Sequence, residues 1–91
     1  MENLVGRFAV SKAGHDAGTV YLIIGQEGER LLLCDGRYKL LAKPKKKSGR
    51  HVRISTVRVE EPLLSGLLNK EKIFDHQVKY AIKKYITNQE V

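Results

Sequence analysis

The chain has 91 residues, of which 42% are hydrophobic, and it carries a formal net charge of +7 at pH 7. This length suits one small domain with a modest core, so we expect neither a cofactor nor a small-molecule substrate. No run approaches the roughly 20 apolar residues of a membrane span, and no signal-peptide or lipidation motif is present. The single cysteine, Cys34, cannot form an internal disulfide, which suits a reducing compartment. We therefore expect a cytoplasmic protein with no membrane attachment.

The positive charge is concentrated in one segment of the chain. Residues 1–36 have a net charge of −2, and residues 60–91 balance five lysines against five acids. Residues 37–53, in contrast, contain eight lysines and arginines and no acid. A local excess of this kind predicts a surface that binds a polyanion.

The first part of the chain reads as short strands separated by glycine-containing turns. Alternating or β-branched apolar residues predict strands over residues 4–11 and 19–24, and residues 30–34 form an apolar run typical of a buried strand. Residues 13–18 are predicted to form a loop and residues 25–28 a turn. These elements indicate a mainly β fold.

The strand pattern continues after Cys34. Asp35-Gly36 between two apolar runs predicts a hairpin turn, followed by a strand that ends near Ala42. Lys43–Arg50 is predicted to be an exposed loop, because Pro44 breaks a ladder and the lysines require water. Its lysines should therefore add little to stability. A fifth strand is expected over residues 51–55, with Val52 and Ile54 facing inward, and five short strands in residues 1–59 predict a small barrel.

The pattern changes to a helical one after Pro62. Residues 63–68 fit either a short helical turn or an apolar linker. Asn69 is predicted to be the N-cap of an amphipathic helix from Lys70 to about Thr87. Its expected apolar stripe comprises Phe74, Val78, Ala81, Ile82 and Tyr85, and its expected polar face comprises Lys72, His76, Lys79 and Lys83. We expect residues 60–91 to form a linker and a helical extension that packs on the barrel.

Several of these residues resemble the KOW motif. Gly6-Arg7 opens an alternating strand, residues 11–18 form a Gly14/Gly18 loop that leads into Thr19-Val20, and the Asp35-Gly36 turn follows in the same order. The stretch from Leu33 to Ser55 resembles the large-subunit ribosomal proteins of the fourteen-e family, and more closely the small bacterial KOW-domain proteins grouped with them. The resemblance covers roughly residues 3–56.

This resemblance implies a five-stranded SH3-like barrel that contacts RNA, in ribosome-associated members rRNA, mainly through its loops. By position, Gly14 and Gly18 would shape the first loop, and Arg7, Lys12 and His15 would lie on or beside it. The family does not require the dense cluster Lys43–Lys47, so RNA binding by that cluster is inferred from electrostatics alone. KOW domains also occur in transcription elongation factors and assembly factors.

The predicted RNA-binding surface joins the basic segment to this loop. Its members are Arg7, Lys12, His15, Arg37, Tyr38, Lys39, Lys43, Lys45, Lys46, Lys47, Arg50, His51 and Arg53. Tyr38 and His51 either stack on unpaired bases or are ordinary surface residues of the sheet. The backbone between Gly14 and Gly18 either approaches a phosphate or only makes a turn.

The residue types do not favour catalysis. One cysteine and three scattered histidines show neither metal-ligand spacing nor a nucleophile with a base, so we expect no enzyme and no metal site. We expect a non-catalytic module that binds structured rRNA as a ribosome-associated or ribosome-assembly protein and is a monomer when free. The alternatives are a protein-interaction adaptor that uses the barrel and the helix, and a KOW-type transcription accessory factor that binds DNA.

Overall fold

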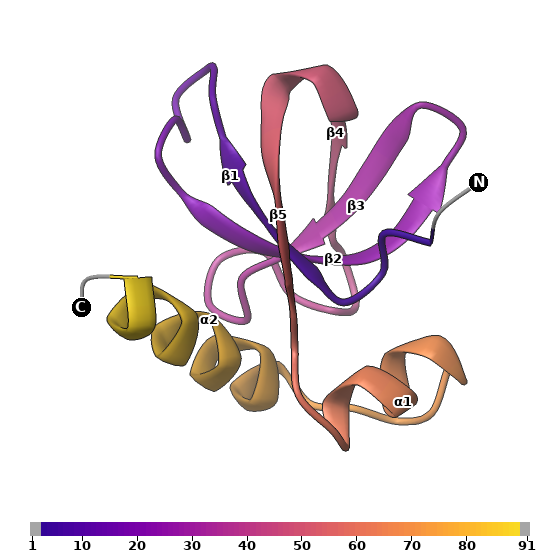
Figure 1. Ribbon diagram of the computed structural model, residues 1–91. Helices are drawn as coiled ribbons and strands as arrows, with labels where there is room; N and C mark the ends of the chain where they lie inside the picture. Colours follow the sequence, from indigo (N-terminus) through magenta and orange to yellow (C-terminus); the bar gives the residue numbers. More distant parts are fainter. Residues whose placement is uncertain (1–2, 90–91) are drawn as a thin grey trace.

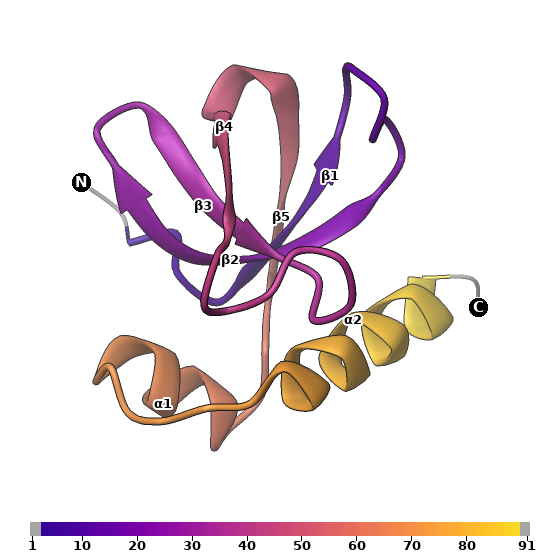
Figure 2. The same cartoon turned by 180° about the vertical axis from the view of Figure 1, so that it is seen from behind.

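The computed structural model describes residues 3–89 and consists of a curved β-sheet packed on two helices (Figures 1 and 2). The elements follow in the order β1 (Arg7–Ser11), β2 (Val20–Glu27), β3 (Arg30–Cys34), β4 (Lys45–Ser48), the 3₁₀ turn η1 (Gly49–His51), β5 (Val52–Arg58), α1 (Leu63–Leu68) and α2 (Asp75–Gln89). The strands form one antiparallel sheet in the order β4-β3-β2-β1-β5.

The sheet bends strongly along β2. The register between β2 and β3 shifts between Ile23 and Gly25, and such a bulge increases the local bend and twist. The two edge strands, β4 and β5, are consecutive in the chain and are joined by η1. Within residues 3–89, no backbone ladder connects β4 to β5. The fold is therefore a five-stranded antiparallel sheet followed by a C-terminal helix.

Each face of the sheet carries buried apolar residues, so the molecule has two apolar clusters. The concave face holds the sheet core, made of Ala9, Tyr21, Ile23, Leu31, Leu33 and Val52. The opposite face joins the helices in the helix-side core, made of Phe8, Leu22, Cys34, Val59, Leu63, Val78 and Ile82. Burial on both faces explains why β2 and β3 are nearly continuous apolar runs.

The helices form a separate layer along one side of the sheet (Figure 1). The ring of Tyr85 in α2 stacks on Phe8 of β1 with 4.3 Å between ring centroids. The side chain of Leu64 in α1 occupies the space beside Gly6, where an added Cβ would lie 2.6 Å from it. The apolar stripe of α2 therefore packs on the sheet of its own chain.

The turn between the second and third strands is later than predicted. β2 continues through Gly25 to Glu27, and the chain reverses at Gly28 and Glu29. A Cβ on Gly25 would lie 2.9 Å from the side chain of Leu32 on β3. Gly25 thus lies within the strand and leaves space for the side chain of Leu32, and it does not form the turn.

The prediction for residues 35–50 was wrong in two places. No strand forms between Asp35 and Ala42, because Asp35 Oδ1 accepts the backbone N–H groups of Arg37, Tyr38 and Lys39 at 2.8–2.9 Å and folds the segment into a compact loop. The predicted loop Lys43–Arg50 instead contains β4, which pairs with β3 from Leu33↔Lys45 to Arg30↔Ser48. The inward orientation of Val52 and Ile54 on β5 is confirmed.

The C-terminal prediction was correct in outline but misplaced the helix start. Residues 63–68 are helical, which decides between the two alternatives for this stretch. Asn69 caps the C-terminus of α1, and Lys70 has a left-handed φ of 56°, so the chain turns there. α2 begins only at Asp75, and Phe74, expected in the apolar stripe, is half exposed. No helix within residues 3–89 is long and apolar enough to cross a membrane.

Candidate nucleic-acid interface

Two lysines of the predicted basic loop are bound to one carboxylate. Lys45 and Lys47 lie on the same face of β4 as the neighbouring Leu33 and Leu31, and their side chains cross the concave face to the β1–β2 loop. Lys45 Nζ lies 3.0 Å from Asp16 Oδ2, and Lys47 Nζ lies 2.9 Å from Asp16 Oδ1. Lys47 also donates to the carbonyl of Ala13 at 2.8 Å. These two ammonium groups bind the edge strand to the first loop.

Asp16 accepts two further hydrogen bonds, from hydroxyl groups. Ser11 Oγ donates to Oδ1 at 2.9 Å, and the hydroxyl of Tyr21 donates to Oδ2 at 2.8 Å. Burial by itself would raise the pKa of this carboxyl, but the hydrogen bonds from Lys47, Lys45, Tyr21 and Ser11 outweigh it and hold the pKa well below its usual value. Burial and the bond to Asp16 raise the pKa of Tyr21. We call these five residues, Ser11, Asp16, Tyr21, Lys45 and Lys47, the Asp16 cluster.

The third lysine of β4 faces outward. Lys46 Nζ lies 3.1 Å from Glu27 Oε1 on β2, and both side chains are more than half exposed. An exposed pair of this kind is weak and exchanges readily with other ions. All three lysines of β4 therefore have an acidic partner, contrary to the predicted acid-free loop, and any contact of theirs with RNA stays a prediction.

A first group of the predicted residues lies at the end of the sheet away from the helices, which we call the distal end (Figures 1 and 2). It is formed by residues 12–19, 28–29 and 49–51, and the backbone N–H of Lys12 bonds to the carbonyl of His51 at 2.8 Å. The predicted residues Lys12, His15, Arg50 and His51 lie here, and Arg53 follows on β5 two residues after η1. All five are exposed and have no ion pair within residues 3–89.

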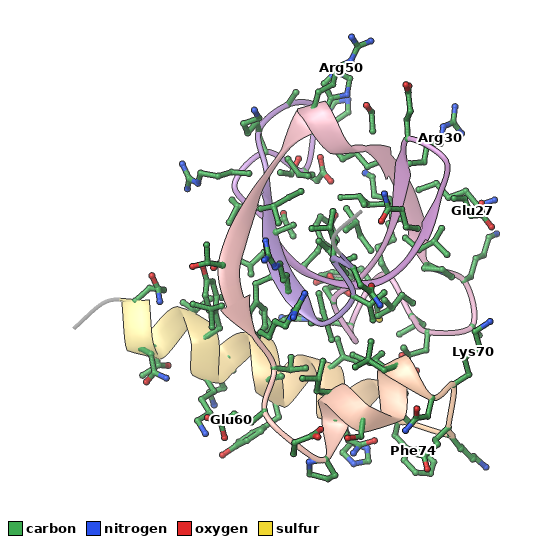
Figure 3. The ribbon with its side chains drawn as sticks, turned by 45° about the vertical axis from the view of Figure 1, so that its right-hand side comes forward. Glu27, Arg30, Arg50, Glu60, Lys70 and Phe74 are labelled. Atoms are coloured by element: carbon green, nitrogen blue, oxygen red, sulfur yellow. The ribbon has the colours of Figure 1, made fainter. Side chains whose placement is uncertain are left out.

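Sequence reasoning missed one cation at the distal end. Arg30 begins β3, pairs with Ser48, and is exposed with no ion pair among the described residues. Figure 3 shows Arg30 and Arg50 projecting outward from this same end. The available signal was the position of Arg30 beside a hairpin turn, where a strand begins next to solvent.

A second group of predicted residues lies in the β3–β4 loop, residues 35–44, on the side of the sheet that faces the helices. Arg37, Tyr38, Lys39 and Lys43 are exposed, and the guanidinium of Arg37 lies 5.0 Å from the centroid of the Tyr38 ring. None of these cations has an ion pair within residues 3–89. The four-residue strand β4, about 14 Å long at roughly 3.4 Å per residue, lies between this group and Arg50.

The glycines of the first loop serve turn geometry. Gly14 and Gly18 have φ values of +87° and +91°, which L side chains rarely adopt. The N–H of Gly18 donates to the carbonyl of Ser11 at 2.8 Å, and the N–H of Ala17 donates to the carbonyl of Gly14 at 3.2 Å. These donors are therefore engaged within the loop. Arg7 lies at the start of β1, paired with Arg58, away from the distal end.

The remaining reactive group, the thiol of Cys34, belongs to the packing. Cys34 is fully buried in the helix-side core, and burial raises its pKa to about 11. A protonated, inaccessible thiol acts as a small apolar side chain.

No model of a known protein family matches the sequence, and no curated protein matches it.

Proposed function

We propose that this protein is a non-catalytic RNA-binding module, a KOW-type SH3-like barrel that docks on structured rRNA as a ribosome-associated or ribosome-assembly protein. The barrel assignment is supported by the strong bend of β2 and by the η1 connection between the two edge strands. It is also supported by the Asp16 cluster, which links β4 to the β1–β2 loop across the concave face. The KOW assignment rests on Gly6-Arg7 and the Gly14/Gly18 loop.

The observation that carries the proposal is the set of cations without acidic partners. Lys12, Arg30, Arg37, Lys39, Lys43, Arg50 and Arg53 have no ion pair within the described residues. Phosphate contacts with such groups release condensed counterions, which drives association with a polynucleotide. A cation already paired within the protein gains less, because it exchanges one anionic partner for another.

The two groups of cations suit a folded RNA better than a single extended strand. The distal end supplies cations around η1, and the β3–β4 loop supplies others at the opposite end of β4, a strand about 14 Å long at roughly 3.4 Å per residue. A structured RNA presents phosphates in several directions, so one molecule can contact both groups. Charge supplies most of the affinity in this mechanism, and the loops read local shape.

Filter binding of a structured rRNA fragment across a salt series tests the proposal. Contact with about five phosphates predicts a log–log slope of about −3.5 to −4.5, from about −0.7 to −0.9 per contact. A slope near zero, or equal affinity for heparin and RNA, would contradict it. Competition between structured RNA and duplex DNA of equal length then separates the ribosomal role from that of a transcription accessory factor.

A further inference from the structure

The β3–β4 loop carries an exposed aromatic ring beside a shallow hollow. Tyr38 is 74% exposed, the highest value among the exposed large apolar side chains of the described residues. The hollow is lined by the loop itself, including Tyr38, Lys39, Leu40, Lys43 and Pro44. A ring in this position offers an apolar face to a ligand, whereas a ring that served the core would be covered.

The loop is held in place from two sides. Within it, Asp35 Oδ1 accepts the N–H groups of Arg37, Tyr38 and Lys39, and the N–H of Asp35 bonds to the carbonyl of Lys39 at 2.9 Å. From α2, Asp75 Oδ1 accepts the N–H of Leu41 at 2.8 Å. The segment that carries Tyr38 is therefore fixed before any ligand arrives, which lowers the entropy lost on binding.

The charges around the hollow favour an anion. Lys39 and Lys43 line it, and Arg37 lies against the Tyr38 ring. The nearby carboxylates are directed at the backbone: one oxygen of Asp35 accepts three N–H groups, and one oxygen of Asp75 accepts another. An apolar ring with ammonium and guanidinium groups around it complements a nucleotide, which has a flat base and a phosphate on either side.

We propose that this hollow binds one unpaired RNA nucleotide, with its base stacked on Tyr38 and its flanking phosphates at Lys39 and Lys43. This site rests on the proposed RNA-binding function and names the part of the RNA that the loop recognises. Bases within a duplex are stacked on one another, so only a nucleotide in a loop, a bulge or an end offers its face to the ring. The distal end then supplies contacts that depend on charge alone.

The test compares two RNAs and three variants. One RNA is a hairpin with a single unpaired bulge carrying 2-aminopurine, a fluorescent adenine analogue, and the other is the same hairpin without the bulge. Tyr38→Ala should weaken binding of the bulged RNA on the order of tenfold, because stacking contributes about 1–3 kcal/mol per base, and should leave the other RNA unaffected. Tyr38→Phe keeps the ring and should bind like the wild type. Tyr80→Ala, which removes a tyrosine on α2 that is 69% exposed, is the matched control.

The outcomes separate the two proposals. Wild-type protein should quench 2-aminopurine fluorescence on binding, and Tyr38→Ala should not. If the wild type binds both RNAs and Tyr38→Ala changes neither the affinity nor the quenching, the nucleotide site is overturned and the RNA-binding function stands. An equal loss for both RNAs also overturns the nucleotide site, because the effect then does not depend on an unpaired base. If the wild type binds neither RNA, both proposals fail.

Discussion

At the scale of single residues, Asp16 links the edge strand β4 to the β1–β2 loop. Its carboxylate receives two lysines from β4 and the hydroxyls of Ser11 and Tyr21, and its side chain is only 14% exposed. A charged group that is removed from water requires such partners, and those partners are left without a counter-charge when the carboxylate is lost. Asp16 therefore determines where the edge strand lies relative to the β1–β2 loop.

Replacing Asp16 with Asn should destabilise the protein. The amide keeps the shape of the carboxyl but leaves Lys45 and Lys47 without a counter-charge, which we expect to cost about 1–3 kcal/mol. For a domain of this size, that lowers the thermal midpoint by roughly 5–20 °C, as followed by circular dichroism. Glu29→Gln is the control, because Glu29 lies in the exposed β2–β3 turn with no ion pair among the described residues. Equal midpoints for the two variants would contradict this role.

The Asp16 cluster also predicts a dependence of stability on pH. The folded-state pKa of Asp16 lies below its ordinary value of 3.8, so the carboxylate is stabilised by folding. Its contribution is fully present above the unfolded pKa and is lost as the pH falls through the folded pKa. The gap in thermal midpoint between the wild type and Asp16→Asn should therefore be constant near neutrality and should narrow as the pH is lowered below about 4. A gap that does not change down to about pH 2 would contradict the assignment.

At the scale of elements, the loop after β3 and the start of α2 depend on each other. Gly36 has a φ of +75°, and a Cβ placed on it would lie 2.3 Å from the carbonyl oxygen of Asp75 and 2.8 Å from the amide nitrogen of Lys79. Because those atoms are backbone, they cannot move aside as a flexible side chain would. The close approach of the loop to the helix is therefore possible only with glycine at this position.

Two glycine variants distinguish the cost of a clash between the loop and α2 from the cost of placing alanine at a positive φ. Gly36→Ala and Gly28→Ala both place alanine at a positive φ, but a Cβ on Gly28 would meet no atom within 4 Å. Each should cost about 1 kcal/mol for the backbone conformation, and Gly36→Ala should cost at least about 1–2 kcal/mol more for displacing the loop from α2. Urea unfolding of both variants measures the difference. Similar costs would show that the loop does not require the contact with α2.

The same scale shows why part of the fold was predictable and part was not. The alternating residues of β1 and β5 and the apolar runs of β2 and β3 carry local signals, and these strands were found. β4 has no apolar signal at all: Lys45-Lys46-Lys47-Ser48 pairs with β3 along its backbone, and its lysines contact Asp16 and Glu27, which are distant in sequence. The side chains of the lysine run alternate between the two faces of the sheet: Lys45 and Lys47 face Asp16, and Lys46 faces the other way. Three identical residues in a row do not show this alternation in the sequence.

At the scale of the whole molecule, sequence composition identified a basic segment but could not show which of its cations contact an acid in the folded protein. Net charge counts all eight cations of residues 37–53 alike. The fold places Lys45 and Lys47 against one carboxylate of the first loop and Lys46 against one of β2, and leaves the others exposed at two places. Whether a lysine meets an acid depends on strand register and loop position, which are tertiary properties. The sequence therefore located the cations of this segment, but not which of them contact an acid in the fold and which are exposed without one among the described residues.

This division predicts that two triple variants with the same change in charge will behave differently. Replacing Lys12, Arg50 and Arg53 with Ala removes exposed cations without partners, so the thermal midpoint should stay within a few degrees, since surface charges contribute about 0–1 kcal/mol. The log–log slope of RNA affinity against salt concentration should become less negative by up to about 2–3. Each phosphate that the variant no longer contacts accounts for about 0.7–0.9 of that change.

Replacing Lys45, Lys46 and Lys47 with Ala should give the opposite pattern. The midpoint should fall by roughly 5–20 °C, because Asp16 is left uncompensated, while the salt slope should change less than in the first variant. Melting curves and filter binding on the same two proteins make the comparison at equal net charge. If both variants lose the same affinity and neither loses stability, the lysines of β4 are ordinary surface charges. The ion pairs with Asp16 would then be too weak to stabilise the fold or to keep Lys45 and Lys47 from binding RNA.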